Sequence, residues 1–153
     1  MAGVARKGGN EMQINNTLSR WQLVPLVFAQ DAVAASQTNV QLFTQQVHGA
    51  VANDTDGYCM PWAGEIVAIS AHLTAAGTAG TFTIGPTIAG VEATDPSVTM
   101  GTSTDKSDTC PRGTNAFAAN AVIGAEITTS AGWDGTSEDL VVTVWVVLKI
   151  DSI

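Results

Sequence analysis

Side chains that could carry out catalysis or bind a metal are few in this chain, and they are scattered. The two histidines are His48 and His72, and the two cysteines are Cys59 and Cys110. A structural zinc site needs four such ligands at short, regular spacings, which these positions do not provide. His72 alternates with apolar residues inside a predicted strand, where a packed or surface histidine is more common than a catalytic one. We therefore predict neither a metal site nor a cofactor.

The stretch Asp54-Thr55-Asp56-Gly57 superficially matches a calcium-binding loop. When Gly57 takes the glycine position of that loop, Ala52 falls at the first ligand position and Ala63 at the last, where a glutamate is required. The sequence also lacks a phosphate-binding loop and a serine nucleophile elbow. No pair of carboxylates suited to glycoside hydrolysis stands out. We predict that the protein is not an enzyme; a small hydrolase would reveal itself by a deep pocket lined with two carboxylates.

Cys59 and Cys110 lie in turn-rich segments beside prolines, Cys-Met-Pro and Cys-Pro, so they could meet at one end of a domain. Two cysteines do not make a disulfide framework, and we favour free thiols over a bridge. Residues 1–16 contain no apolar stretch of the kind found in a secretory signal. We therefore expect the protein to be made in a cytoplasm.

Charge is sparse and unevenly distributed along the 153 residues. Only 13% of the residues are charged, about half of the roughly 25% found in typical soluble domains. The first 20 residues hold three basic residues against one acidic residue, and the other 133 hold three basic and 13 acidic residues. Such an acidic body argues against a nucleic-acid surface, which needs clustered Lys and Arg. The low charge favours a protein that buries surface in an assembly.

The elements that must position these residues are strands. Leu140–Ile150 is the longest near-continuous apolar run, and its β-branched residues favour a strand over a helix. At 11 residues it is too short for a membrane-spanning helix, which takes about 20. Its alternating positions are apolar on both sides. Leu140, Val142 and Val144 suit the core of a sandwich, whereas Val141, Trp145 and Val147 need cover from another element of this chain or from another chain.

Further strands follow from alternation and from turn residues. Residues 21–29 form an edge strand or a bent arm, because Pro25 removes a ladder donor. Residues 65–75 and 81–84 form a hairpin around the turn at 76–80. The remaining predicted strands are residues 40–51, 87–91, 97–100 and 121–129, and residues 101–115 and 131–139 are predicted loops.

The pattern of short strands predicts an all-β fold, an antiparallel β-sandwich of jelly-roll-like type with an extended N-terminal arm. We divide the chain into an arm at 1–29, a connector with a first strand at 30–57, and a sandwich domain at 58–153. No segment predicts a long amphipathic helix.

Several segments carry a resemblance to a known family. They are Pro61–Ala71, Thr78–Thr81, Ile88–Val91, Phe117–Gly124, Ile127–Ser130, Trp133 and Asp139–Val147. Together, across residues 58–150, they resemble the capsid decoration (cement) and head-fibre proteins of tailed bacteriophages, and also modules of phage tail and receptor-binding proteins. The resemblance implies a structural virion protein, a homotrimeric β-sandwich on the outer surface of the capsid. Such proteins reinforce junctions between capsomers of the major capsid protein, often through an N-terminal arm.

From this resemblance and from the residues we expect two contact surfaces, and neither a nucleic acid nor a membrane as partner. In the arm, Arg6, Lys7 and Arg20 would supply charge to the capsid contact, and Trp21, Leu23 and Phe28 would be its apolar anchors. The alternative is that Trp21 and Phe28 belong to the protein's own core. Val141, Trp145 and Val147 would form the interface between subunits.

A rival expectation is an adhesion module that binds a host surface through its loops. The tips of residues 101–115 and 131–139 would then be the binding surface, with Trp133 exposed. Binding of the isolated domain to a glycan or a cell surface would favour this alternative.

Overall fold

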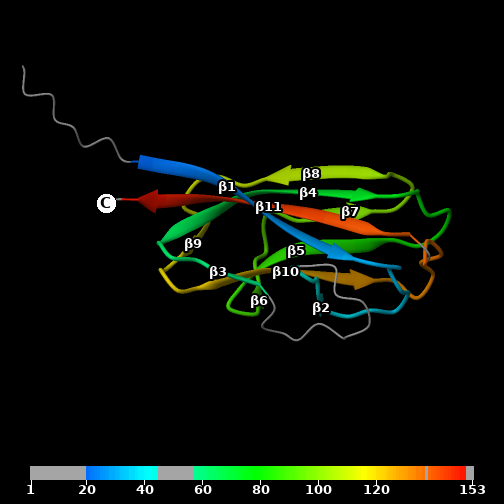
Figure 1. The fold of residues 1–153 in the computed structure, drawn as a ribbon. Helices are drawn as coiled ribbons and strands as arrows, with labels where there is room; N and C mark the ends of the chain where they lie inside the picture. Colours follow the sequence, from blue (N-terminus) through cyan, green and yellow to red (C-terminus); the bar gives the residue numbers. More distant parts are fainter. Residues whose placement is uncertain (1–19, 45–56, 137, 151–153) are drawn as a thin grey trace, which may run out of the picture.

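The computed structural model describes residues 20–44, 57–136 and 138–150, and within them the backbone but not the side chain of Arg20. These residues form eleven strands that run antiparallel in two sheets (Figure 1). No helix among them is long and apolar enough to cross a membrane. The predicted all-β, antiparallel sandwich is thereby confirmed.

One sheet is five-stranded, with the order β1-β11-β4-β8 and with β9 paired to β4. Its strands are β1 (Arg20–Gln30), β4 (Gly64–Leu73), β8 (Asp105–Thr109), β9 (Asn115–Phe117) and β11 (Leu140–Ile150). The two longest strands, β1 and β11, pair over their whole length, from Arg20 opposite Ile150 to Gln30 opposite Leu140. Residues 20–30 are therefore an edge strand of the body, and residues 1–19 of the predicted arm lie outside the described residues.

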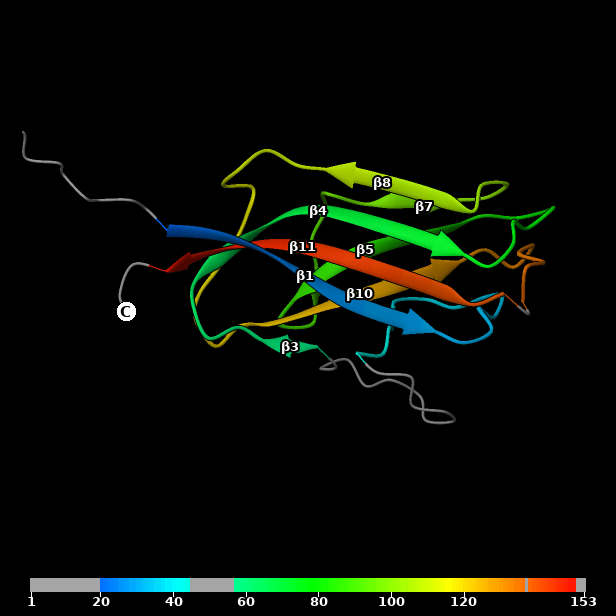
Figure 2. The same ribbon diagram turned by 45° about the horizontal axis from the view of Figure 1, so that its top comes forward.

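The other sheet is six-stranded, with the order β2-β10-β5-β6, and β3 and β7 pair with β10 and β5. Its strands are β2 (Val40–Gln41), β3 (Tyr58–Cys59), β5 (Phe82–Ile88), β6 (Val91–Glu92), β7 (Val98–Met100) and β10 (Val122–Thr129). Figure 2 shows β5 and β10 of this sheet lying behind β4, β11 and β1 of the first sheet.

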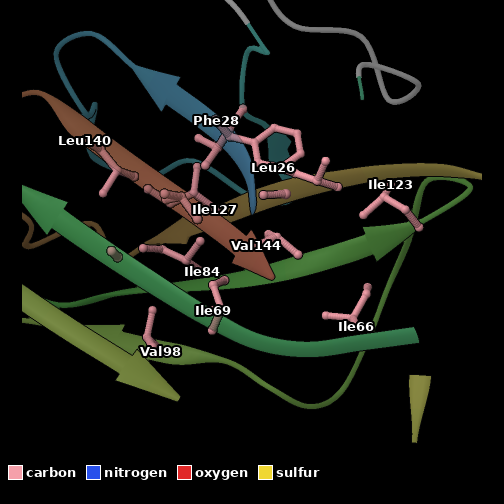
Figure 3. Packing of buried hydrophobic residues seen from close by; sticks show 14 of the residues in the cluster. Leu26, Phe28, Ile66, Ile69, Ile84, Val98, Ile123, Ile127, Leu140 and Val144 are labelled. Atoms are coloured by element: carbon pink, nitrogen blue, oxygen red, sulfur yellow. The ribbon is translucent and has the colours of Figure 1, made fainter. Parts of the chain in front are cut away.

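The core lies between the two sheets. Figure 3 shows buried side chains that point toward one another from both layers. The five-stranded sheet contributes Leu26, Phe28, Ile66, Ile69, Leu140 and Val144, and the six-stranded sheet contributes Ile84, Val98, Ile123 and Ile127. Leu140, Val142 and Val144 of β11 are fully buried, so the inner face of this strand is the core face that its alternation predicts.

The predicted hairpin of residues 65–84 is wrong. β4 belongs to the five-stranded sheet and β5 to the six-stranded sheet, so residues 74–81 cross from one layer to the other. The crossing is held by Asp134, whose carboxylate accepts hydrogen bonds from the backbone of Thr78 and Ala79 at 2.9 Å each. Gly80 is required here because its φ is +75° and a Cβ would collide with the backbone of Trp133.

Two further predictions need correction. The predicted loop of residues 101–115 contains β8, a polar edge strand whose backbone pairs with β4 from Ala68 to His72. Residues 82–88 form one strand, β5, in place of the separate strands predicted at 81–84 and 87–91. Of the strand predicted at 40–51, β2 covers Val40–Gln41, and residues 45–56 lie outside the described residues.

Candidate functional site

The register of β1 and β11 creates one apolar surface on the outer face of the five-stranded sheet. Directly opposed residues of an antiparallel pair point to the same side of the sheet. Leu26 opposite Val144 and Phe28 opposite Val142 point into the core. The alternate pairs therefore point outward: Trp21 with Lys149, Leu23 with Val147, Pro25 with Trp145, Val27 with Thr143 and Ala29 with Val141. We call Trp21, Leu23, Pro25, Val27, Val141, Trp145 and Val147 the outer strip.

The outer strip is exposed although it is apolar. Leu23 is 56% exposed, Val27 46%, and Trp21 and Val141 43% each, and Trp145 is half-buried. A single exposed apolar residue needs no explanation, but contiguous ones on a soluble protein mark a surface for a partner. The exception is Val147, which is buried between its register partners Leu23 of β1 and Glu65 of β4.

Pro25 is tolerated in this surface because β1 is an edge strand. The backbone N–H of Ala29 points away from β11 and donates to the carbonyl of Phe43 at 2.9 Å. Positions two apart along a strand direct their N–H groups to the same side, so the N–H that Pro25 lacks would point away from β11 as well. The ladder between β1 and β11 therefore stays intact, and proline also makes the open edge a poor template for further strands.

One end of the outer strip is fixed by Arg112, a residue with no role predicted from the sequence. Its guanidinium carbon lies 4.1 Å from the centroid of the Trp21 ring, at a distance typical of a cation–π contact. Its Nε donates to the buried carboxylate of Glu65, which also accepts the N–H of Gly113. The turn that carries Arg112 thus ties the beginning of β1 to β4.

Beside the outer strip, and sharing Val141 with it, the same sheet face carries a shallow hollow of about 510 Å³. Ser70, His72, Asp105, Ser107 and Thr143 contribute to its lining. The Nδ1 of His72 lies 2.7 Å from Oδ1 of Asp105. The hydroxyl of Thr104 and the imidazole of His72 lower the pKa of Asp105, because both hydrogen-bond to its ionised carboxylate.

This hollow does not match a hydrolase or a metal centre. It has one carboxylate, whereas glycoside hydrolysis uses two. Among the described residues, no three His, Cys, Asp or Glu side chains are placed to hold a metal ion. His48, Asp54 and Asp56 lie outside the described residues.

The two cysteines are free thiols, as predicted. Cys59 is exposed and Cys110 is buried, where its Sγ donates to the carbonyl of Ile66 at 3.2 Å. Burial raises the pKa of the Cys110 thiol. A thiol with a raised pKa is a poor nucleophile, so Cys110 is a core residue and not a reactive one.

The structure brings together residues that the sequence assigned to two different surfaces. Trp21 and Leu23, predicted to contact the capsid, lie on the same outer strip as Val141, Trp145 and Val147, predicted to contact another subunit. Phe28 belongs to the protein's own core, which is the alternative stated for it above. Its ring packs edge to face on Tyr58 with centroids 5.5 Å apart. Arg6 and Lys7 lie outside the described residues, and the side chain of Arg20 is not described.

Trp133 is buried, which corrects the expectation that it is exposed at a loop tip. Its ring packs edge to face on Phe82 with centroids 4.7 Å apart, and its Nε1 donates to the carbonyl of Val33 at 3.1 Å. The loop of residues 131–139 therefore turns its aromatic residue into the core and offers no aromatic anchor to a ligand.

No family model matches the chain, and no curated protein matches it.

Proposed function

We propose that this protein is a structural component of a phage virion, a homotrimer that decorates the outside of the capsid and stabilises contacts between capsomers of the major capsid protein. The observation that carries the proposal is the outer strip, an apolar surface on a chain that otherwise resembles capsid decoration proteins in residues 58–150. A surface of this kind is suited to permanent association with another protein.

We assign the outer strip to contact between copies of the chain. Each copy has a net charge of −8, so close approach of two copies is unfavourable wherever acidic residues meet. The outer strip contains no charged residue from Leu23 to Val27 on β1 and from Val141 to Val147 on β11. Copies that meet through it bury apolar side chains without opposing like charges.

This assignment changes the role of Trp21 and Leu23. They share one face with Trp145, so a partner that lies along β1 and β11 can cover all three. We therefore place Trp21 and Leu23 in the subunit contact, and leave the capsid contact to residues 1–19 with Arg6 and Lys7, and to the adjoining end of the body. A trimer presents three such contacts, and the second and third are effectively intramolecular once the first has formed. Binding the assembled shell in preference to its free subunits stabilises the assembled state.

Sedimentation of two aspartate variants tests the subunit contact. Trp145→Asp places a charge in the middle of the outer strip and is expected to give a monomer. Thr83→Asp adds the same charge at an exposed position on the outer face of the six-stranded sheet and is expected to leave the trimer intact. Val27→Asp, at a more exposed position of the strip, repeats the test if Trp145→Asp lowers folding stability. A folded Trp145→Asp variant that stays trimeric contradicts the assignment.

Co-sedimentation with capsids tests the decoration role. The full chain is expected to sediment with shells in a fixed ratio. A chain lacking residues 1–19 is expected to stay folded, because β1 is kept whole, and to lose shell binding. Undiminished binding by the shortened chain contradicts the role of residues 1–19.

Host-surface binding is the second candidate, and the hollow beside the outer strip is the observation that favours it. Hydroxyl groups of Ser70, Ser107 and Thr143 and the His72–Asp105 pair could hydrogen-bond a sugar. The hollow includes residues of the segment 101–115 that the adhesion alternative named. Binding of the isolated protein to a glycan array, abolished by His72→Ala, would support this candidate.

A further inference from the structure

The outer face of the five-stranded sheet is divided lengthwise into an apolar half and a polar half. The outer strip occupies β1 and β11, the outermost strand and its neighbour (Figure 2). On β4 and β8 the outward positions carry Ser70, His72, Asp105 and Ser107, because His72 is the register partner of Val141 on the strip and of Asp105 on β8. The side chains of His72 and Asp105 are 59% and 72% exposed. The apolar surface is therefore a narrow band along one edge of the sheet.

This division argues against contact by stacking one whole sheet on another. Stacked sheets lie about 10 Å apart face to face, so a second copy laid flat on this face would cover β4 and β8 together with β1 and β11. It would bury the His72–Asp105 pair and the hydroxyl groups beside it. Burying polar or charged groups without new partners costs free energy. A favourable contact leaves the polar half in water.

Contact by extension of the sheet is also disfavoured. β1 pairs with β11 along its whole length, and on its other side the described residues form one backbone bridge, between Ala29 and Phe43. A second β1 that paired with the rest of this edge would meet Pro25, which cannot donate in the middle of the ladder. The contact that remains is between side chains of the strip.

We infer that three copies meet edge to edge around an axis that runs along β1 and β11, with their polar halves turned away from it. The inference rests on the proposed function, which assigns the outer strip to contact between copies of a trimer. From Trp21 to Val27 the strip is about 20 Å long, and its two strands are about 5 Å apart. A band this narrow is covered on both flanks when three copies bring their β1 edges to one axis.

The arrangement fixes the relative direction of the copies. Rotation about an axis parallel to the strands keeps all three copies pointing the same way, and it closes the assembly at three. Residues beside the axis then lie near the same residues of the other copies, Leu23 beside Leu23 and Val27 beside Val27. Both are uncharged, and Lys149, which faces outward opposite Trp21, has an interaction within its own chain. The chain also enters β1 at the same end of all three copies, as simultaneous contact of residues 1–19 with one shell requires.

Cysteine cross-linking tests this arrangement. The background is Cys59→Ser, which removes the exposed thiol and leaves the buried Cys110. In it, Leu23→Cys and Val27→Cys each place one thiol on the strip. We expect a short bis-maleimide to join copies within each variant, seen as pairs of linked chains in a denaturing gel. Ser107→Cys, at an exposed position of the polar half, is the matched control and is expected to give no linked product above that of the background.

The outcomes are distinguishable once sedimentation has shown the oligomeric state of each variant. Linked product that forms only when Leu23→Cys and Val27→Cys chains are mixed in urea and refolded together would mean antiparallel copies, and overturns the inference. Linking of Ser107→Cys as strong as that of Val27→Cys would mean stacked sheets, and also overturns it. A trimer in which neither strip variant is linked overturns the inference and leaves the trimer in place. A wild type that sediments as a monomer overturns the proposed subunit contact and the inference together.

Discussion

The two sheets treat their outer faces in opposite ways. On the five-stranded sheet, the outer strip leaves apolar side chains such as Leu23 and Val27 in contact with water. On the six-stranded sheet, the outer face carries Gln41, Thr87 and Glu126, which are polar and yet buried. Each face reverses the usual distribution of residues, in which apolar side chains are inside and polar ones outside.

The difference shows on which outer face the side chains find their contacts within the chain itself. Gln41 donates through Nε2 to Oε2 of Glu126 at 2.9 Å and accepts the hydroxyl of Thr87 at 3.3 Å, so these buried polar groups have partners in the same molecule. Four apolar residues of the outer strip have no such cover, since Trp21, Leu23, Val27 and Val141 are each 43% to 56% exposed. Buried polar side chains that hydrogen-bond to one another are explained by the fold itself, whereas contiguous exposed apolar side chains are the kind of surface that another protein can cover.

The largest effect is expected when two neighbouring residues of β1 that point to opposite faces of the sheet are compared. Phe28 and Val27 are neighbours on β1, but Phe28 is fully buried and Val27 is on the outer strip. Phe28→Ala leaves a cavity and removes the contact with Tyr58, so we expect it to lower the free energy of unfolding by about 3–5 kcal/mol. Val27→Ala is the matched control, with an expected change within about 0.5 kcal/mol in the monomer.

Urea unfolding of the two variants in a monomeric background, such as Trp145→Asp, measures this difference. Equal losses of stability in the two variants would show that the outer strip is part of the core, and would remove the contrast between the faces of β1.

The second-largest effect is expected on the outer face of the six-stranded sheet, where polar side chains are buried. Gln41→Ala removes a donor to the buried carboxylate of Glu126, and losing a partner of a buried charged group costs about 2 kcal/mol. Thr83→Ala, at an exposed position of the same sheet, is the control and is expected to change the free energy of unfolding by less than about 0.5 kcal/mol. If Gln41→Ala were as stable as the control, the buried polar contacts of this face would contribute nothing to the fold.

Sequence patterns predict a strand well where side chains decide its position. Leu140–Ile150 was predicted with both bounds, because β-branched residues alternate along it and one face must be buried. β8 was missed, because the sequence DKSDT has no apolar face and its place is set by backbone pairing at a sheet edge. The hairpin at 65–84 was wrong for a related reason. Glycine and threonine suit a hairpin turn and a loop that crosses between two sheets equally well. The contact of residues 78–79 with Asp134 cannot be recognised from the sequence.

The candidate site was predictable in parts but not as a whole. The two-faced apolar pattern of β11 identified Val141 and Trp145 as residues in need of cover. That Trp21 and Leu23 lie beside them could not be predicted, because the register joins strands from opposite ends of the chain. Arg112 was missed because a single arginine in a Pro-Arg-Gly turn gives no pattern. Its role follows from the contact with Trp21 and Glu65.

The third effect, smaller again, is expected at Leu23, where substitution distinguishes folding stability from self-association. Leu23→Ser replaces a residue of the outer strip that is 56% exposed, and we expect it to change the unfolding free energy of the monomer by less than about 0.5 kcal/mol. A protein stabilised by self-association has a Tm that rises with its own concentration. We expect this dependence in the wild type and a weaker one in Leu23→Ser. Thermal scans over a hundredfold range of concentration would measure it, and a wild-type Tm that does not depend on concentration would argue against burial of the strip between copies.

The smallest effect is expected from polar contacts that are exposed to solvent, in contrast to those of Glu126. Hydrogen bonds from the hydroxyl of Thr78 and the backbone of Ala79 lower the pKa of Asp134 below its ordinary value, because they stabilise the ionised carboxylate. The folded chain therefore releases this proton more readily than the unfolded chain. The resulting stability is fully present above the unfolded pKa, near 3.9, and is lost as the pH falls through the lowered folded pKa.

Asp134→Asn tests this dependence, because its Oδ1 can still accept from the backbone of Thr78 and Ala79, whereas its Nδ2 can only donate to the Thr78 hydroxyl, and the amide does not titrate in this range. Between about pH 5 and pH 2 we expect the Tm of the wild type to fall slightly more than that of the variant, with the two curves parallel above pH 5. The difference must be small, since solvent screens an exposed carboxylate. Asp105→Asn is the parallel variant, because the pKa of Asp105 is also lowered. Identical curves for the wild type and Asp134→Asn would mean that the contact between the crossing and residue 134 holds equally well with a neutral side chain. Residue 134 would then direct the chain from one sheet to the other through the shape of its side chain and not through its charge.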